Sequence, residues 1–301
     1  MFEILDGLLM ALADSVPGVS GGTIAFLLGF YDRLIGSLRK IVSRNAAERK
    51  DALRFLLVLG IGWGAGLILA MLLLDGLIET HIYSVSSVFL GFVLASIPVV
   101  VWKERASLKA HLAASWMILT GFLLVFLITR FSISGGVELN ISRITLGNGL
   151  ILFIAAAAAA SAMVLPGISG SSLLMAFGLY LPVISKVSAL LHGDFSALLM
   201  VGVFGLGVLA GLCGFVRLLN RALKRLRAHT IYAVIGMMIA SLYAVVAGPL
   251  TLKQPQPMLS MASFRPECFV LGCAVIAGLT FFEKLQSKKI AEREGKVYEK
   301  G

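Results

Sequence analysis

Charged residues are scarce in this chain. Asp, Glu, Lys and Arg together make up 14% of its 301 residues, whereas 58% are hydrophobic. A soluble domain carries about 25% charged residues, so this composition excludes an ordinary soluble protein. Cysteine is also rare: Cys213, Cys268 and Cys273 all lie in apolar segments without CxxC spacing. Their positions argue against a disulfide framework and a metal site, and no cofactor is expected.

Two familiar signals are missing from the sequence. No phosphate-binding loop is present, so direct use of ATP is not expected. The N-terminal stretch "MFEILDGLLM" has acidic residues where a secretory signal has basic ones, so it is expected to belong to the mature fold. The net charge of +10 could suggest nucleic acid, but the basic residues sort by membrane side, and no nucleic-acid partner is expected.

Long hydrophobic runs dominate what is present, and most are near the ~20 residues that a bilayer core requires. The six predicted spans cover residues 53–74, 86–102, 112–130, 197–216, 230–247 and 267–283. The fold class is therefore predicted to be an all-α polytopic membrane protein.

The basic residues indicate which side of the membrane each connection faces. Most of the 26 lysines and arginines fall within four regions, residues 33–54, 103–109, 217–227 and 284–300. The positive-inside rule places these regions, and with them both termini, in the cytoplasm. The connections predicted outside are residues 75–85, 131–149, 181–196 and 248–266.

This assignment puts residues 131–149 and 181–196 on the same side, so the apolar stretch between them must cross an even number of times. Two full spans do not fit there at a rise of ~1.5 Å per residue. We therefore predict a re-entrant hairpin over residues 150–180. Non-helical backbone at that depth must be buried in protein or line a wet cavity.

The turn of this hairpin, "LPGISGS" at 165–171, repeats "VPGVSGG" at 16–22. Residues 1–38 should therefore form a second hairpin, entered from the cytoplasm. Further on, the spacing of Gly60, Gly62 and Gly66 recurs in a second set of glycines: Gly205, Gly207 and Gly211. The chain reads as a duplication.

The two repeats are predicted to be residues 1–145 and 146–301, each with one hairpin and three spans. Because three is odd, the second repeat is inverted relative to the first. Inverted repeats with interrupted helices near the midplane are typical of secondary transporters.

The repeated motifs suit an anion such as phosphate. Proline and glycine should end one short helix and begin another, so that helix N-termini point toward the membrane centre. Hydroxyl groups that could act as caps or additional donors are those of Ser20, Thr23, Ser169, Ser171 and Ser172. Two facing tips would form one site. The alternative is that each Pro-Gly merely kinks a packed helix.

Asp14 is the one acidic residue predicted deep in the bilayer, where an ionisable group usually serves function. Beside an anion site, its protonation could couple binding to a proton. Alternatively, it caps the following helix or pairs with a basic residue. Arg130 and Arg143 flank the outer approach to the second hairpin and could contact phosphate, or could simply snorkel to the interface.

The strings "LADSVPGVSGGTIAFLLGFYDRLI" and "ASAMVLPGISGSSLLMAFGLY" resemble the bacterial polyprenyl-phosphate transporter family PopT over nearly the whole chain. The resemblance implies a lipid transporter in the bacterial cytoplasmic membrane that returns undecaprenyl phosphate from the outer to the inner leaflet. By this resemblance, the residues that hold the headgroup are Pro17, Gly18, Ser20, Gly21, Gly22, Thr23, Pro166, Gly167, Ser169, Gly170, Ser171 and Ser172. The polyprenyl tail would stay among the membrane lipids.

Two other functions share parts of this pattern. Undecaprenyl pyrophosphate phosphatases of the BacA type have similar inverted repeats, but hydrolysis requires acidic residues and an arginine at the site, which "PGISGSS" lacks. A transporter of a small soluble anion would satisfy every argument made from symmetry and helix dipoles.

Overall fold

The computed structural model describes residues 2–14, 20–41, 43, 45–134, 146–165, 170–251 and 254–281. In these ranges the secondary structure is helical, with no strand, which confirms the predicted all-α class. The predicted site residues that lie outside the described ranges are Pro17, Gly18, Arg143, Pro166, Gly167 and Ser169.

Six helices in the described part are long and apolar enough to cross a membrane. They are Ala46–Ala70, Thr80–Lys103, Leu112–Ile133, Gly147–Val164, Phe195–Arg225 and Arg227–Leu250. Gly147–Val164 lies where the sequence predicts the first arm of a hairpin. The predicted span 267–283 corresponds to a shorter apolar helix, Pro266–Phe281.

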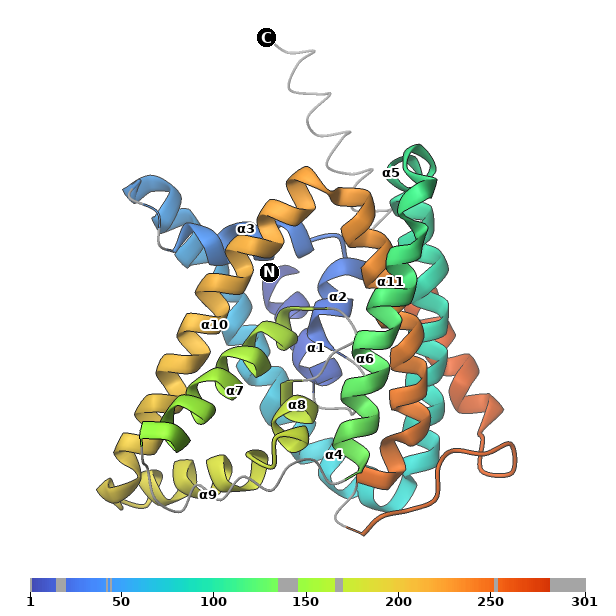
Figure 1. Ribbon diagram of the computed structural model, residues 1–301. Helices are drawn as coiled ribbons and strands as arrows, with labels where there is room; N and C mark the ends of the chain where they lie inside the picture. The colour runs from blue at the N-terminus through green and yellow to red at the C-terminus, as the bar shows by residue number, and fades with distance from the viewer. Residues whose placement is uncertain are drawn as a thin grey trace.

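The first two of these spans belong to one continuous helical segment, α4 (Ala46–Lys103). Its backbone leaves helical geometry at His81, where φ is −130° and ψ is 35°. The chain therefore reverses direction at a kink instead of passing through a long loop, and the two spans lie at an angle to one another (Figure 1).

Glycines allow helix backbones to approach closely in two matching pairs: α1 (Phe2–Asp14) against the first span of α4, and α7 (Leu146–Val164) against α10 (Leu198–Arg225). A Cβ placed on Gly62 would lie 1.9 Å from the Ile4 carbonyl oxygen, and one on Gly207 would lie 2.5 Å from that of Phe153. One turn further on, Gly66 and Gly211 repeat these contacts on Leu8 and Ala157. Small residues are what such helix crossings in membranes require.

A second type of glycine contact is reciprocal. α6 (Met117–Ile133) packs on α11 (Arg227–Ala247), with Gly121 against Ala233 and Gly236 against Ile118. The second span of α4 meets the helix Pro266–Phe281 in the same way, through Gly91 and Gly272. Each helix thus contributes one glycine to the crossing, and a Cβ at any of these positions would clash with backbone.

Two short helices follow α1 and α7. α2 (Gly21–Leu27) and α8 (Gly170–Ala176) each contain seven residues. Each is followed by a glycine of positive φ, Gly29 at 77° and Gly178 at 65°, a conformation that side chains other than glycine rarely adopt. The next helices, α3 (Tyr31–Lys40) and α9 (Tyr180–Leu191), both begin at a tyrosine.

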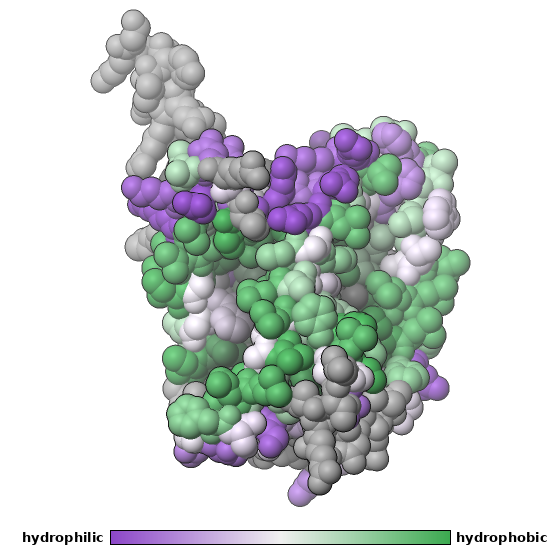
Figure 2. Space-filling view, turned by 60° about the vertical axis from the view of Figure 1, so that its left-hand side comes forward, coloured by the Kyte–Doolittle hydropathy of each residue, from purple (hydrophilic) through white to green (hydrophobic). Residues whose placement is uncertain are grey.

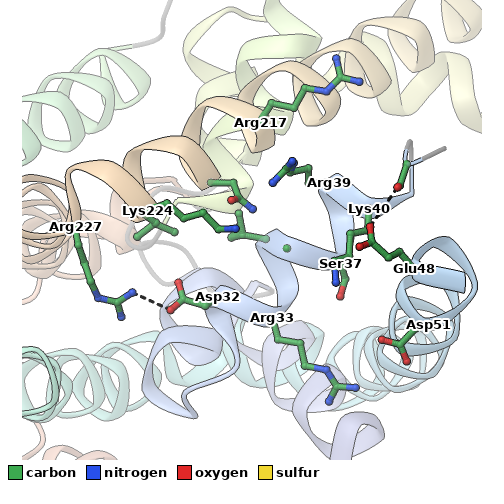
Figure 3. A pocket seen from close by; sticks show the side chains of 15 residues that line it. Asp32, Arg33, Ser37, Arg39, Lys40, Glu48, Asp51, Arg217, Lys224 and Arg227 are labelled. Carbon is green, nitrogen blue, oxygen red and sulfur yellow. Dashed lines mark hydrogen bonds and ion pairs between the residues drawn. The ribbon is translucent and has the colours of Figure 1, made fainter. Parts of the chain in front are cut away.

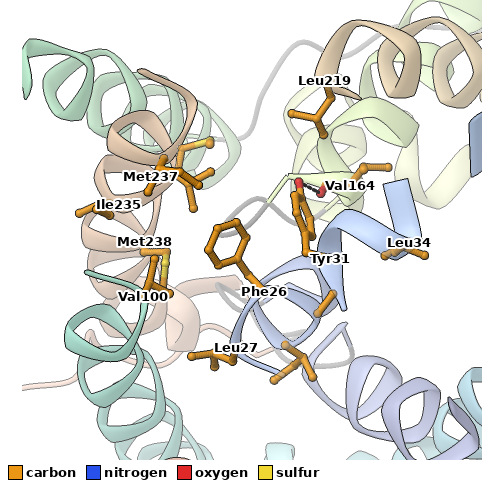
Figure 4. Packing of buried hydrophobic residues seen from close by; sticks show 14 of the residues in the cluster. Phe26, Leu27, Tyr31, Leu34, Val100, Val164, Leu219, Ile235, Met237 and Met238 are labelled. Atoms are coloured by element: carbon orange, nitrogen blue, oxygen red, sulfur yellow. Dashed lines mark hydrogen bonds between the residues drawn. The ribbon is translucent and has the colours of Figure 1, made fainter. Parts of the chain in front are cut away.

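The short helices lie inside the molecule, between one group of helices formed by α7 and α10 and another formed by α6, α11 and α4 (Figure 1). Phe26 and Tyr31 project from the α2–α3 segment into a buried apolar cluster that includes Val164, Leu219 and Met238 (Figure 4). The Tyr31 hydroxyl donates to the Val164 carbonyl oxygen at 2.9 Å. The two halves of the chain therefore share one core.

The surface divides into bands. Hydrophobic side chains form a belt around the middle, and polar residues gather at the two ends (Figure 2). Leu57, Ile61 and Leu206 in the spans are each more than 60% exposed, as expected of side chains that face lipid. The short helix α5 (Arg105–Ala110) and α3 lie at one end, which we call the basic side, and α9 lies at the other (Figure 1).

Three 3₁₀ turns complete the described structure: Leu112–Trp116, Phe195–Ala197 and Gly248–Thr251.

Candidate functional site

A hydrogen bond links Ser20, at the start of α2, to Leu165, the residue before Pro166. Ser20, fully buried at the start of α2, donates its hydroxyl to the carbonyl oxygen of Leu165 at 3.1 Å. Leu165 immediately precedes the second motif. A hydrogen bond thus joins segments that are 145 residues apart in the chain, as expected if the two motifs form one site.

Ser20 also determines where α2 begins. Its backbone is extended, with φ −131° and ψ 140°, and its hydroxyl oxygen accepts from the Gly22 N–H at 3.1 Å. The Thr23 N–H donates to the Ser20 carbonyl oxygen at 2.9 Å. This is a serine N-cap, which satisfies donors that the first helical turn would otherwise leave without partners.

Asp14, the last residue of α1, provides the remaining contact at the start of α2. Its Oδ1 accepts from the Gly21 N–H at 2.6 Å, and its Oδ2 accepts from the Trp63 indole N–H at 3.0 Å. Trp63 lies in the first span of α4, so the carboxylate links three helices. A partly buried indole N–H needs an acceptor, and the Asp14 carboxyl group supplies it.

These contacts correct one expectation. The sequence predicts free N–H groups at the start of each short helix, but in α2 those of Gly21, Gly22 and Thr23 all have partners within the chain. The reason is that the Asp14 carboxylate itself occupies the helix N-terminus, the place predicted for an anion. The alternative that Asp14 caps the following helix is therefore confirmed.

The second motif differs at the corresponding place. Where the first repeat has Asp14, the second has Met163, which cannot accept a hydrogen bond from the N-terminus of α8 as a carboxylate would. A Cβ on Gly170 would lie 2.4 Å from Met163 Cγ, and one on Gly21 would lie 2.7 Å from Asp14 Oδ2. At both positions the short helix thus lies against the side chain of the residue three positions before the motif proline. The side chains of Ser171 and Ser172 are outside what the structure describes.

A cavity of about 150 Å³ lies beside Asp14. Residues from both halves line it: Met10, Asp14, Gly22, Leu34, Leu38, Trp63, Met163 and Val164. Ligand pockets for drug-sized molecules are roughly 300–1,000 Å³, so this cavity could hold a group the size of phosphate but not a polyprenyl chain. A lipid substrate would have to leave its tail outside.

Sequence reasoning missed Trp63, Tyr31 and Lys103 as parts of this centre. The Lys103 ammonium donates to the carbonyl oxygen of Leu27 at 2.6 Å and so caps the C-terminal end of α2. The sequence places Lys103 among residues that fix topology. One signal for Trp63 was present, because its indole N–H lies in a span with no polar neighbour in sequence.

The predicted arginines do not gather at this centre. Arg130 is exposed in the last turn of α6, on the side of the molecule opposite α3, and Arg143 lies outside the described residues. Arg33 is bound to Glu3 at 2.9 Å and lies over the ring of Phe55. Within the described ranges no three His, Cys, Asp or Glu residues come together as metal ligands.

Comparison with known proteins places this sequence in a family. Residues 10–261 match a family described as undecaprenyl phosphate translocase-like. A protein of Vibrio cholerae serotype O1, named polyprenyl-phosphate transporter, is 32% identical over 249 residues, which cover 79% of this chain and 75% of that protein. A protein of the same name from Staphylococcus aureus is 33% identical over 252 residues, covering 82% of this chain and 86% of its own length.

No solved structure matches the chain. The family match covers most of the sequence and includes both Pro-Gly-Ser motifs, and both relatives are identical to the chain at about a third of the aligned residues. The chain belongs to the undecaprenyl phosphate translocase-like family.

Proposed function

We propose that this protein transports undecaprenyl phosphate across the bacterial cytoplasmic membrane, returning the lipid carrier to the inner leaflet for reuse. The family and the two relatives named as polyprenyl-phosphate transporters support the substrate. The observation that supports the site is the hydrogen bond from Ser20, in the first Pro-Gly-Ser motif, to Leu165, which precedes Pro166 of the second. The phosphate binds between the motifs while the polyprenyl tail remains in lipid.

An inverted duplication with re-entrant hairpins is the architecture we infer. The helix pairs α1–α4 and α7–α10, crossing at equivalent glycines, support the duplication, as do the equivalent short helices α2 and α8. α2 and α8 rise only about 10 Å each, too little to cross a bilayer core. Each short helix with the helix before it therefore enters the membrane and returns.

The residues that we propose to surround the phosphate are those of the two motifs. They are Pro17, Gly18, Ser20, Gly21, Gly22, Thr23, Pro166, Gly167, Ser169, Gly170, Ser171 and Ser172. Arg130, at the opposite side from α3, and Arg143 are proposed as contacts for the headgroup.

Asp14 gives this site a means of coupling to protons. While ionised, the carboxylate holds the Gly21 N–H and repels a phosphate. Protonation removes the repulsion and weakens the hold on Gly21, because a neutral acceptor makes a weaker hydrogen bond than a charged one. Phosphate can then take the place of the carboxylate at α2. Release of the proton on the other side of the membrane leaves the Asp14 carboxylate ionised again and so restores the starting state of the site.

The two halves then rock about their shared core, so that the site opens first to one side of the membrane and then to the other. By the positive-inside rule, the basic residues gathered on the side of α3 and α5 support a cytoplasmic position for these two helices. In a background without the native cysteines, Ser196→Cys on the opposite side should react with a membrane-impermeant maleimide in intact cells, whereas Ala106→Cys on the basic side should react only after permeabilisation. Labelling of Ser196→Cys only after permeabilisation would reverse the proposed orientation.

The principal test is transfer between leaflets in proteoliposomes that contain the purified protein and a fluorescent short-chain analogue of undecaprenyl phosphate. Ser20→Ala combined with Ser169→Ala should abolish transfer. The matched control is Ser96→Ala with Ser241→Ala: both serines are buried, but each bonds only a carbonyl of its own helix. The control should transfer as the native protein does.

Other outcomes identify the rival functions. Release of phosphate from undecaprenyl pyrophosphate, without transfer, would mean that the motifs serve hydrolysis. Transfer that inorganic phosphate or sulfate suppresses, together with uptake of those ions, would mean a transporter of small anions. Equal activity of the motif variant and the control would move the site away from Ser20 and Ser169.

A further inference from the structure

Two adjoining cavities open on the basic side, between α3 and the C-terminal third of α10. Their volumes are about 920 and 350 Å³. Both are lined by Arg39 from α3 and by Arg217, Asn220 and Lys224 from α10. Figure 3 shows Arg39 on α3 beneath α10, which carries Arg217 and Lys224. We call this pair of cavities the basic vestibule.

The cations of the basic vestibule fall into two groups. Arg227 at one edge is neutralised, because it contacts Asp32 at 3.0 Å and Glu104 at 2.5 Å. Arg39, Arg217 and Lys224 have no carboxylate partner among the residues that the structure describes. The acids that line the larger cavity, Asp32, Glu48 and Asp51, come from α3 and α4, and no carboxylate lines the smaller one. The α10 side is therefore a concentration of uncompensated positive charge.

Asn220 adds an observation that does not depend on charge. Its side chain is only 7% exposed and lines both cavities. No fully buried side-chain nitrogen or oxygen in the described part of the chain lacks a hydrogen-bond partner. The Asn220 amide, for which the described residues offer no partner, therefore faces the cavities, where it can bond water or a ligand. A buried amide amid unpaired cations is therefore a donor ready for an anion.

The spacing on α10 gives the vestibule its direction. Arg217, Asn220 and Lys224 lie three and four residues apart, so they share one helix face and span about 10 Å along the axis. Beneath them, Leu219 and Leu223 are buried in the cluster that joins α10 to α3. The row of polar groups thus runs from within the molecule toward the basic side.

α3 separates the vestibule from the cavity beside Asp14. Leu34 and Leu38 line the Asp14 cavity, whereas Ile35 and Arg39 line the vestibule. A headgroup that leaves the motif site toward the basic side therefore has to pass only this helix to reach the row of cations.

We propose that the basic vestibule is a second anion site, which binds a phosphomonoester group on the basic side of the protein. Arginine guanidinium groups bind phosphate oxygens in pairs, lysine adds a point charge, and the Asn220 amide supplies a neutral donor. Two sources share this chemistry: the headgroup of a polyprenyl phosphate and free inorganic phosphate. That the ligand is the polyprenyl phosphate headgroup rests on the proposed function, whereas the presence of an anion site does not.

The test is equilibrium binding to the full chain in detergent, with inorganic phosphate in one arm and farnesyl phosphate in the other. Arg217→Gln with Lys224→Gln should weaken binding about tenfold or more, the equivalent of ~1.4 kcal/mol or more. The control, Arg49→Gln with Lys50→Gln, removes the same charge from the same side, at exposed residues that do not line the cavities. Asn220→Leu tests the site at constant charge and should weaken binding several-fold.

Farnesyl phosphate bound more tightly than inorganic phosphate identifies the lipid headgroup as the ligand, whereas equal affinities identify the phosphate group alone; both support the site. Equal losses in the vestibule variant and the Arg49–Lys50 control would overturn it, since general electrostatics would then explain the binding. So would native affinity in Asn220→Leu. Failure of the proposed function would be seen in the proteoliposome assay, as absence of leaflet transfer by the native protein. It would not change these binding results.

Discussion

The contact between Asp14 and Trp63 allows the strongest test of how the centre is held together. In Asp14→Asn, the carbonyl oxygen keeps the shorter contact with the Gly21 N–H, and the amide nitrogen in place of Oδ2 cannot accept from the Trp63 indole. One hydrogen bond to a charged acceptor is lost, and such bonds contribute roughly 1.5–3 kcal/mol. Trp63→Phe removes the same bond from the other partner.

The two substitutions should therefore not be additive. A double-mutant cycle on Asp14→Asn and Trp63→Phe should give a coupling free energy of about 1.5–3 kcal/mol, because the bond can be lost only once. The assay is unfolding by SDS titration in mixed micelles, followed by circular dichroism. The matched control uses Trp102→Phe, since Trp102 is 58% exposed and packs on Arg105 instead.

The cycle with Trp102 should give no coupling. A coupling below about 0.5 kcal/mol for Asp14 and Trp63, the usual scatter for independent sites, would refute the account of Asp14 as a charged link between α1, α2 and α4. The same Asp14→Asn protein tests proton coupling in proteoliposomes. We expect its leaflet transfer to lose dependence on a pH gradient, and unchanged dependence would rule out Asp14 as the coupling group.

Three further predictions concern stability, each measured by SDS-induced unfolding. Gly62→Ala should lower the unfolding free energy by about 1–3 kcal/mol, since its Cβ would meet the Ile4 carbonyl, whereas Gly60→Ala, facing open space on the same helix, should be neutral or slightly stabilising. Arg227→Lys should cost about 1 kcal/mol because an ammonium cannot hold both oxygens of Glu104; no loss would mean that solvent already screens the pair. Ser20→Ala should cost about 1–2 kcal/mol through loss of the N-cap, and a silent change would contradict the capping geometry.

The sequence predicts the helical class, because hydrophobic runs of span length require helices in a bilayer. The meeting of the two Pro-Gly-Ser motifs at one site stays a prediction, which the hydrogen bond between Ser20 and Leu165 supports.

What the sequence could not predict depends on contacts between distant residues. Nothing local indicates that Trp63 faces Asp14, that Lys103 reaches Leu27, or that Asn220 lines a cavity beside arginines. Each follows from how the helices cross, and the crossings are set by which glycines face backbone and which face open space. Gly62 and Gly60 are indistinguishable in sequence yet opposite in this respect.

The ion pairs of Arg227 have a consequence for the rate of transport. It joins the start of α11 to Asp32 on α3 and to Glu104 at the end of α4, so it closes the basic side across both halves of the chain. If the halves rock apart there in every cycle, this clasp must open each time. Each 1.4 kcal/mol by which it favours the closed form would make the open form tenfold rarer. The strength of the Arg227 ion pairs would then limit the transport rate. Stronger ion pairs would give a protein that is more stable but transports more slowly.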